Sequence, residues 1–265
     1  MTPNILTDPR LRSVAWKDLT TMSRVETAKE LTLSLPWLVL SLYLAGRGLY
    51  PLAAAASFFF FLTGLRQVHD AHHYNLGLSR AATEWVMFAL SVAMLGSMHA
   101  VQFNHLRHHK HCLDEEDVEA RSAGMSWWKA LLWGPVFPVL LHATALRKAA
   151  RRKLAWIYGE LLANAAVIGL VLVVVPTRPL RYHLVAMAVG HCLTAFFAVW
   201  TVHHDCDPSH DVARTLRNPL KSAVAFDMFF HVEHHLFPKV PTCHLPELAR
   251  RLDAVAPELS AKQVY

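Results

Sequence analysis

The chain has 265 residues, of which 54% are hydrophobic and 17% are charged, with a formal net charge of +6. An ordinary soluble domain carries about 25% charged residues, so this composition favours a membrane protein. The four cysteines form no C-x-x-C pair, which argues against a disulfide framework and against a thiolate zinc site. The 10 glycines and 14 prolines show no periodic bias, which excludes collagen-like and disordered chains.

Uncharged runs locate the candidate membrane segments. A hydrocarbon core of about 30 Å needs about 20 helical residues, so the shorter runs must recruit flanking residues or lie in the interface. We expect the first two runs to form one helical hairpin and the last two to form another. Hydropathy slightly favours a membrane span for the third run (85–106). It disfavours a span for the fourth run (130–146), which contains Gly134, Pro135 and Pro138. In chain order, the six runs are 31–46, 48–65, 85–106, 130–146, 161–177 and 182–204.

Basic residues indicate the orientation of the hairpins, because loops rich in Lys and Arg are retained on the cytoplasmic side. They gather in the first 30 residues and in segment 146–153, whereas the expected hairpin turns hold only Arg47, Arg178 and Arg181. These patterns predict an all-α, multi-pass membrane protein. It would have two transmembrane helical hairpins, interfacial or re-entrant helices between them, and a cytoplasmic histidine-rich cap.

Histidine is unusually frequent, with 18 residues against 20 acidic ones, and the pattern H-x-x-H-H occurs three times. On a helix, positions i, i+3 and i+4 lie on one face, so each box can point its imidazoles at a common point. Neutral imidazole is a ligand of iron, zinc, copper and nickel. One box alone would be weak evidence, but three predict a metal centre. The candidate ligands are His69, His72 and His73 in box one, His105, His108 and His109 in box two, and His231, His234 and His235 in box three.

Nine imidazoles exceed the number of ligands that one ion takes, so we expect two ions shared among the boxes. Sharing requires box two on the same side of the membrane as the others, so run three must be interfacial or re-entrant, or must cross and return before Asn104. His203 or His204, at the end of run six, offers a further ligand, although the helix dipole equally explains a histidine there. The other histidines lack this spacing and are expected to be exposed or hydrogen-bonded: His99, His111, His142, His183, His191, His210 and His244.

We expect one domain over residues 1–265 rather than several. Its parts in chain order are a cytoplasmic N-terminal segment (1–30), the first hairpin (31–68), boxes one and two with interfacial helices (69–155), the second hairpin (156–204) and a cytoplasmic segment with box three (205–265).

The three boxes resemble those of the integral-membrane fatty acid desaturases and their hydroxylase and ketolase relatives. The resemblance rests on residues 69–73, on residues 104–109, and most specifically on His-Val-Glu-His-His-Leu-Phe-Pro at 231–238. It covers most of the chain, residues 31–252. It implies a non-haem centre of two iron ions that activates O₂ and removes hydrogen from an unactivated alkyl chain.

The resemblance also implies the ligand set, box by box. It includes the box histidines and an imidazole from His203 or His204, while His72 is less firmly implied, because the family's first box is commonly H-x-x-x-H. Acyl-CoA members of the family supply an Asn from the last membrane helix as well. In this chain the residues one helical turn before His203 and His204 are Val199 and Trp200, so this Asn is absent or comes from elsewhere.

Elementary chemistry agrees with a redox metal. An aliphatic C–H bond has no acidity for a base to exploit, whereas a redox metal with O₂ can supply the oxidant and zinc cannot. The substrate needs an apolar slot, and segments 58–61 and 196–197 offer phenylalanines as candidate walls, although lipid contact or core packing is the commoner role of any one of them. Asp70 and Glu233 could accept ring N–H bonds from the boxes, or could be solvated surface carboxylates.

The expected function is that of a fatty acyl desaturase that introduces a C=C bond into an alkyl chain. Lipid or carotenoid hydroxylation or ketolation by the same site is an alternative. A histidine-rich metal transporter is a remote one, because transport calls for ionisable residues at mid-membrane depth. We expect a lipid substrate, a location in a bacterial inner membrane with the active site on the cytoplasmic side, and no nucleic acid. The sequence has no G-x-G-x-x-G segment, so we expect a separate electron donor, ferredoxin-like or cytochrome-like, which the basic face could steer.

Overall fold

The computed structural model describes residues 5–207 and 209–264, and within them helices are the main elements. Beta pairing in these residues is limited to isolated bridges, so the predicted all-α class is confirmed. The α-helices are α1 (Pro9–Arg12), α2 (Arg24–Thr32), α3 (Leu35–Gly46), α4 (Tyr50–His72), α5 (Arg80–Met94), α6 (Met98–His111), α7 (Trp127–Trp133), α8 (Val136–Lys148), α9 (Arg151–Gly169), α10 (Arg178–Thr194), α11 (Thr201–His203), α12 (Pro219–Val224), α13 (His231–Leu236) and α14 (Leu245–Asp253).

Shorter helical segments complete the fold. Four are 3₁₀ turns: η1 (Lys17–Thr20), η2 (Glu119–Ser122), η5 (Thr242–His244) and η6 (Pro257–Ala261). Two are π-helical and continue the long helices α9 and α10: η3 (Leu170–Val174) and η4 (Ala195–Trp200).

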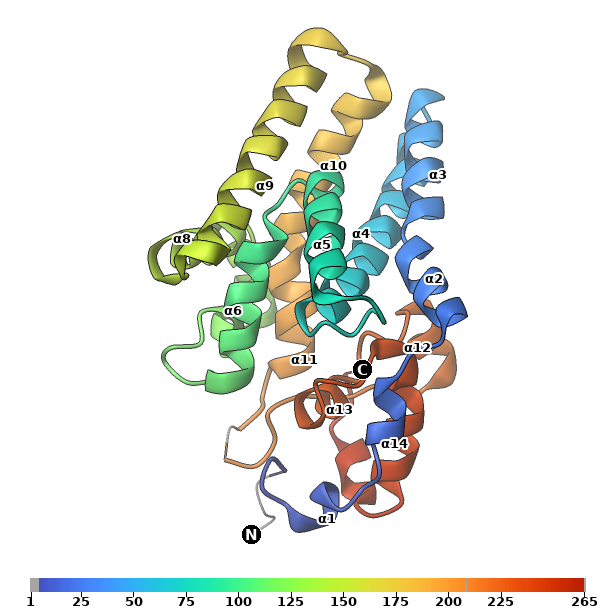
Figure 1. Ribbon diagram of the computed structural model, residues 1–265, viewed down its shortest axis with the longest axis vertical. Coiled ribbons are helices and arrows are strands. Elements are labelled where there is room, and N and C mark those ends of the chain that lie inside the picture. The colour runs from blue at the N-terminus through green and yellow to red at the C-terminus, as the bar shows by residue number, and fades with distance from the viewer. Residues whose placement is uncertain (1–4, 208, 265) are drawn as a thin grey trace.

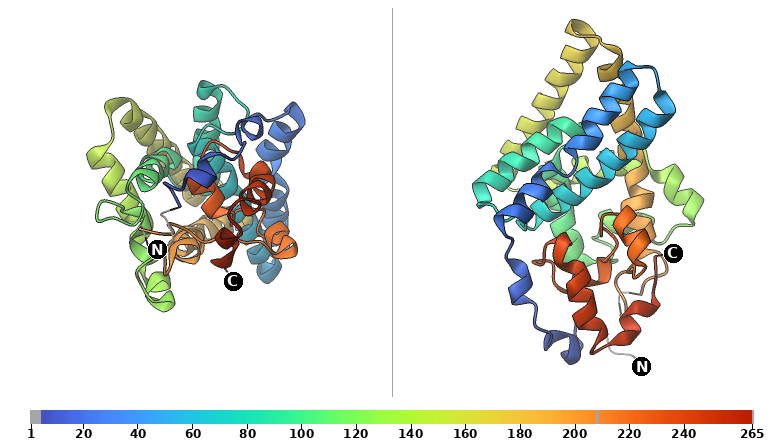
Figure 2. Two further views of the ribbon diagram at one scale, coloured as in Figure 1. Left: turned by 90° about the horizontal axis from the view of Figure 1, so that it is seen from below. Right: turned by 90° about the vertical axis from the view of Figure 1, so that its right-hand side faces the viewer.

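The molecule is elongated, and its two ends differ in character (Figure 1). The turn that joins α9 to α10 lies at one end, whereas α1, α13 and α14 lie at the other end, and the side view agrees (Figure 2). The second end, which we call the cap, has its own apolar core, in which Leu11, Phe230 and Leu248 are buried together. The chain thus combines a bundle of long helices with a compact cap.

In the part of the chain that the structure describes, three single helices are long and apolar enough to cross a membrane, by length and composition: α4, the helix Arg151–Val174 and the helix Arg178–His203. The predicted second hairpin corresponds to the last two, which turn between Val174 and Arg178. Helix α3 packs against α4 as the predicted first hairpin requires, but its 12 residues extend only about 18 Å, less than a hydrocarbon core of about 30 Å. These helices make the chain a membrane protein with a shorter first arm than expected.

Run three does not form a straight span. Helices α5 and α6 meet at 113°, with Leu95 in the left-handed conformation at the break, and α7 and α8 meet at 59°. The bend is compatible with a broken span or a re-entrant segment, and a path of this kind brings box two to the side of the other boxes, as the shared-ion hypothesis requires.

A buried charged cluster holds the bend between α5 and α6. His99 is fully buried, and its ring nitrogens lie 2.5 Å from Glu84 Oε2 on α5 and 2.7 Å from Glu160 Oε1 on α9. Ser97 Oγ donates to the other oxygen of Glu160 at 2.5 Å. The expectation that His99 is hydrogen-bonded is confirmed. Because a buried carboxylate without partners is costly, these contacts favour one angle between the helices.

Gly134, between α7 and α8, lies directly against the backbone of α10. A Cβ at this position would lie 1.8 Å from the carbonyl oxygen of Cys192, and a backbone atom cannot give way as a flexible side chain does. We therefore expect Gly134→Ala to reduce the free energy of unfolding by about 1–3 kcal/mol, the usual cost of overpacking. Thermal melting in detergent measures this, with Gly169→Ala as the control, because a Cβ there meets nothing within 4 Å. Equal melting temperatures for the two variants would contradict the packing described here.

Candidate metal centre

The three boxes occupy the ends of elements that meet where the helical bundle joins the cap. Box one forms the last turn of α4, because this helix continues beyond its apolar run to His72. Box two lies in the second half of α6, and box three forms most of α13. Helix α4, helix α6 after its bend from α5, and the short cap helix α13 therefore bring the three boxes together from distant parts of the sequence.

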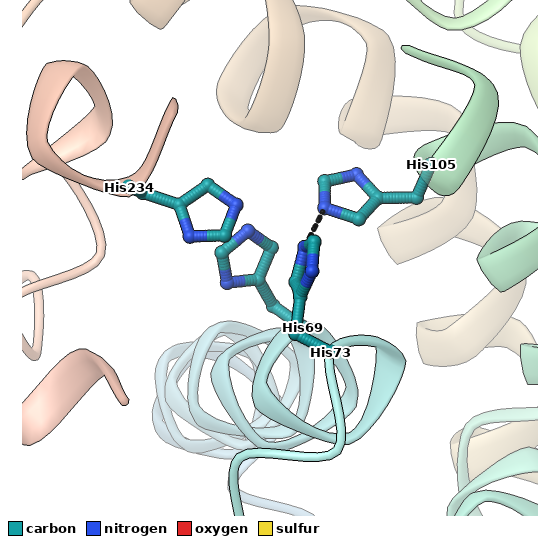
Figure 3. A group of neighbouring side chains, drawn as sticks. All are labelled: His69, His73, His105 and His234. Carbon is teal, nitrogen blue, oxygen red and sulfur yellow. Dashed lines mark hydrogen bonds between the residues drawn. The ribbon is translucent and has the colours of Figure 1, made fainter. Parts of the chain in front are cut away.

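The first group of ligand atoms comes from all three boxes (Figure 3). His69 and His73 extend from α4, His105 from α6 and His234 from α13, and one ring nitrogen of each lies within 4.8 Å of those of the others. His73 Nε2 and His105 Nε2 are 3.0 Å apart. His109 lies beside this group, with its Nε2 2.8 Å from that of His234 and 3.2 Å from that of His105.

The second group consists of His108, His203, His231 and His235, all buried and again within 4.8 Å at their ligand atoms. His231 Nε2 lies 3.0 Å from His203 Nε2 and 3.2 Å from His235 Nε2, and His108 Nε2 lies 3.2 Å from His235 Nε2. Boxes two and three contribute to both groups. The second hairpin adds His203 to this group, at the end of its last helix.

Three predicted ligands lie outside both groups of four: His109, which lies beside the first group, His72 and His204. His72 is buried beside the groups, with its ring centroid 5.4 Å from that of His105. His204, the alternative to His203, stacks its ring on that of Trp200 at a centroid distance of 3.9 Å. Its Nδ1 also donates to the backbone carbonyl of Trp200 at 2.8 Å. The structure therefore places His203, and not His204, among the clustered imidazoles.

The protonation pattern of these rings suits metal ligation. His203 Nδ1 lies 2.7 Å from the carbonyl oxygen of Val212, which can only accept, so Nδ1 carries the proton and Nε2 presents a lone pair to the group. Among the described residues, the buried Nε2 atoms of His69 and His72 have no hydrogen-bond partner. Lone pairs that face one another in a buried space are unfavourable unless a cation lies between them.

Burial supports the same conclusion for box three. It lowers the pKa of His231, His234 and His235 well below the ordinary value for histidine, and neighbouring imidazoles lower it further. These rings are therefore neutral, and neutral imidazole is the form that binds a metal ion.

A family model described as fatty acid desaturase matches residues 45–265, most of the chain. The chain belongs to the fatty acid desaturase family. This confirms the resemblance seen in the boxes, and it makes the protein a membrane oxidoreductase of a family that uses two irons. No curated protein matches the sequence significantly.

The residues present fit the iron pair of the fatty acid desaturase family. Two separate groups of four imidazoles match two ions, and the ring nitrogens that face one another within each group are the atoms that would hold them. Nitrogen-rich sites suit redox-active iron.

Two carboxylates from the loop after box two orient its imidazoles. Glu119 Oε1 accepts from His105 Nδ1 at 2.9 Å, and Asp117 Oδ2 accepts from His108 Nδ1 at 2.7 Å. Burial raises the pKa of Asp117, but the hydrogen bond and charge interaction with His108 and the backbone hydrogen bonds from Leu113 and Ala120 together lower it below its usual value. Both bonds leave Nε2 free for a metal and make the imidazole a better ligand. Our sequence analysis missed these residues, although an acidic cluster directly after box two was the available signal.

The carboxylates that we had predicted for this role do something else. Asp70 Oδ1 accepts from both the backbone N–H and the hydroxyl of Thr242 at 3.0 Å, which ties box one to the cap. Glu233 accepts from Thr215 Oγ1 at 2.8 Å and forms an ion pair with Arg217 at 2.6 Å. Neither alternative predicted for Asp70 and Glu233 is confirmed, because both side chains are buried rather than solvated and both bond to partners other than the box imidazoles.

An apolar cavity of about 870 Å³ opens onto the two histidine groups. Histidines of both groups line one part of it, including His69, His108 and His203, and most of the remainder is lined by apolar side chains, which come from α4 and α10 and also from α6, α8 and α12. Of the predicted aromatic walls, Phe58, Phe61 and Phe197 line this cavity, whereas Phe60 is packed in the core. The cavity provides what C–H oxidation needs, an apolar space in contact with the metal ligands.

Replacing Glu119 tests its role in holding the metal. We expect Glu119→Gln to weaken iron binding about 10- to 100-fold, the usual cost of losing the partner of a ligating imidazole. Iron retained by the purified protein during titration with a chelator measures this. Glu115→Gln is the matched control, because Glu115 is exposed in the same loop. Equal iron retention by both variants would show that Glu119 does not support His105.

Proposed function

We propose that this protein is an O₂-dependent oxidoreductase that introduces a C=C bond into a fatty acyl chain. The observation that carries the proposal is the position of two buried groups of four imidazoles on the wall of one apolar cavity. Family membership supports the chemistry, and the cavity supports an alkyl substrate. The sequence Glu-His-His-Leu-Phe-Pro at 233–238 favours desaturation over hydroxylation or ketolation, which the same site would otherwise serve.

The residues of the site divide the work between them. The iron pair, when bound, would supply with O₂ the oxidising power that an unactivated C–H bond requires. The clustered histidines would hold the ions, and Asp117 and Glu119 would keep two of the imidazoles in the ligating tautomer. The apolar walls, such as Phe61 and Leu65, bind the alkyl chain and exclude water from it.

We also propose that the site faces the cytoplasm and receives electrons from a separate donor, ferredoxin-like or cytochrome-like. The hairpin turns at the opposite end carry few basic residues, chiefly Arg47, Arg178 and Arg181, whereas Arg250 and Arg251 belong to the cap. This asymmetry supports a cytoplasmic cap by the positive-inside rule. A basic surface could also steer an acidic donor toward the cap.

Expression in a host with a simple lipid profile tests the proposed function. We expect new lipid species that have lost two hydrogens, detected by mass spectrometry, and we expect His234→Ala to abolish them, because it removes a ligand from the first group. His111→Ala is the matched control, since His111 bonds to Asp114 at 3.0 Å, outside both groups.

The outcomes separate the candidate functions. A gain of one oxygen in place of the loss of two hydrogens would favour a hydroxylase or ketolase. Unchanged products from His234→Ala would contradict the assignment of box three. A tightly bound zinc without O₂ consumption would favour a metal transporter or sensor.

A further inference from the structure

A second pocket lies near the end of the molecule opposite the cap, where the ends of the two helical hairpins come together (Figure 1). Its volume is about 540 Å³. The first hairpin supplies Tyr50, the first residue of α4. The second hairpin supplies the other lining residues, which are Pro176, Arg178, Arg181, Tyr182 and Val185. The pocket is therefore a feature of the contact between the hairpins, and no histidine of the metal centre lines it.

Two arginines give this pocket a positive charge. Arg178 and Arg181 are three residues apart on α10, so their side chains lie on the same face of the helix. Arg178 also reaches the turn of the first hairpin, because a Cβ on Gly48 would lie 4.0 Å from Arg178 Nη1. The sequence has no Asp or Glu between residues 31 and 69 or between residues 161 and 204. The hairpin ends thus hold cations without any carboxylate of their own to neutralise them.

The other walls of the pocket are aromatic or apolar. Tyr50 and Tyr182, one from each hairpin, have ring centroids 5.9 Å apart. Tyrosine is enriched where hydrocarbon meets the head groups of a membrane, because its ring is apolar and its hydroxyl is polar. Val185 and Val189 follow on the same side of α10 and are 64% and 52% exposed. A ligand along this face would meet cations at one end and apolar surface at the other.

The position of the pocket along α10 matches the depth of lipid phosphates. Arg178 is the first residue of the helix Arg178–His203, whose 26 residues rise by about 39 Å. The hydrocarbon core is about 30 Å thick, so the first turn of this helix lies among the head groups. Guanidinium groups bind phosphate oxygens through paired, charge-assisted hydrogen bonds. A soluble anion would use the arginines alone, whereas a phospholipid would also use the tyrosine rings and the valines.

We propose that this pocket binds an anionic phospholipid from the leaflet opposite the cap. The phosphate lies between Arg178 and Arg181, and the glycerol region lies beside the two tyrosines. One acyl chain follows Val185 and Val189 toward the middle of the membrane. Two arginines without a carboxylate favour a head group with net negative charge over a zwitterionic one. Because each hairpin supplies part of the pocket, the lipid joins their ends.

Lipid binding in this pocket does not depend on the proposed oxidation, so its test needs neither iron nor turnover. The full-length protein, purified in a neutral detergent, is titrated with phosphatidylglycerol, with phosphatidylcholine and with inorganic phosphate. Arg178→Gln and Arg181→Gln each remove one charge from the pocket, and both side chains are exposed, so the fold is expected to tolerate the changes. Arg47→Gln is the matched control, because Arg47 is exposed on the turn of the first hairpin but does not line the pocket.

Native mass spectrometry measures the affinity for lipid, and thermal melting measures the stabilisation that the lipid causes. We expect each pocket variant to bind phosphatidylglycerol about fivefold more weakly than wild type, the usual effect of one basic residue at a lipid surface. We expect Arg47→Gln to bind it as wild type does. Phosphatidylglycerol should also raise the melting temperature of wild type and Arg47→Gln more than that of Arg178→Gln or Arg181→Gln.

Four results would overturn the inference. Wild-type affinity in both pocket variants would show that the lipid binds elsewhere. An equal loss in Arg47→Gln would show a general attraction to a basic surface instead of a site. Equal affinity for phosphatidylcholine would contradict the preference for a negative head group. The same stabilisation by inorganic phosphate would show a site for a soluble anion and not for a lipid.

Discussion

The structure depends on the convergence of neutral imidazoles whose lone pairs face one another in a buried space. His203 shows the constraint most clearly, because its Nδ1 proton bonds to a carbonyl and its Nε2 lies 3.0 Å from that of His231. Neutral rings held in this way gain little from one another, and burial lowers the pKa of the box-three histidines, which disfavours their charged form. A pair of cations would make the arrangement favourable, so metal binding and the folding of this region are coupled.

Much of the remaining structure serves to bring three boxes to this place. The bend between α5 and α6, held by His99 between two carboxylates, directs box two back toward α4. The cap is tied to box one through Asp70 and Thr242, and Lys239 donates to the carbonyl of His73 at 2.9 Å. Because box three lies in the cap, each of these contacts also sets the position of its imidazoles relative to those of α4.

The sequence predicted the helical class, the two hairpins and the clustered histidines, because helical spacing and long apolar runs are local properties of a chain. It could not decide between His203 and His204, since their difference arises from the direction in which each leaves the helix end. It offered Asp70 and Glu233 as possible partners of the imidazoles because they lie inside the boxes, whereas the carboxylates that bond to imidazoles, Asp117 and Glu119, come from the segment after box two. The pocket at the hairpin ends was equally invisible, because its walls come from two hairpins packed side by side.

The central claim is that the two histidine groups each hold one iron. Anomalous X-ray diffraction at the iron absorption edge, on crystals of the protein purified with its metal, tests this most directly. The account predicts two peaks, one among His69, His73, His105 and His234 and the other among His108, His203, His231 and His235. A single peak, or a signal at the zinc edge alone, would contradict it.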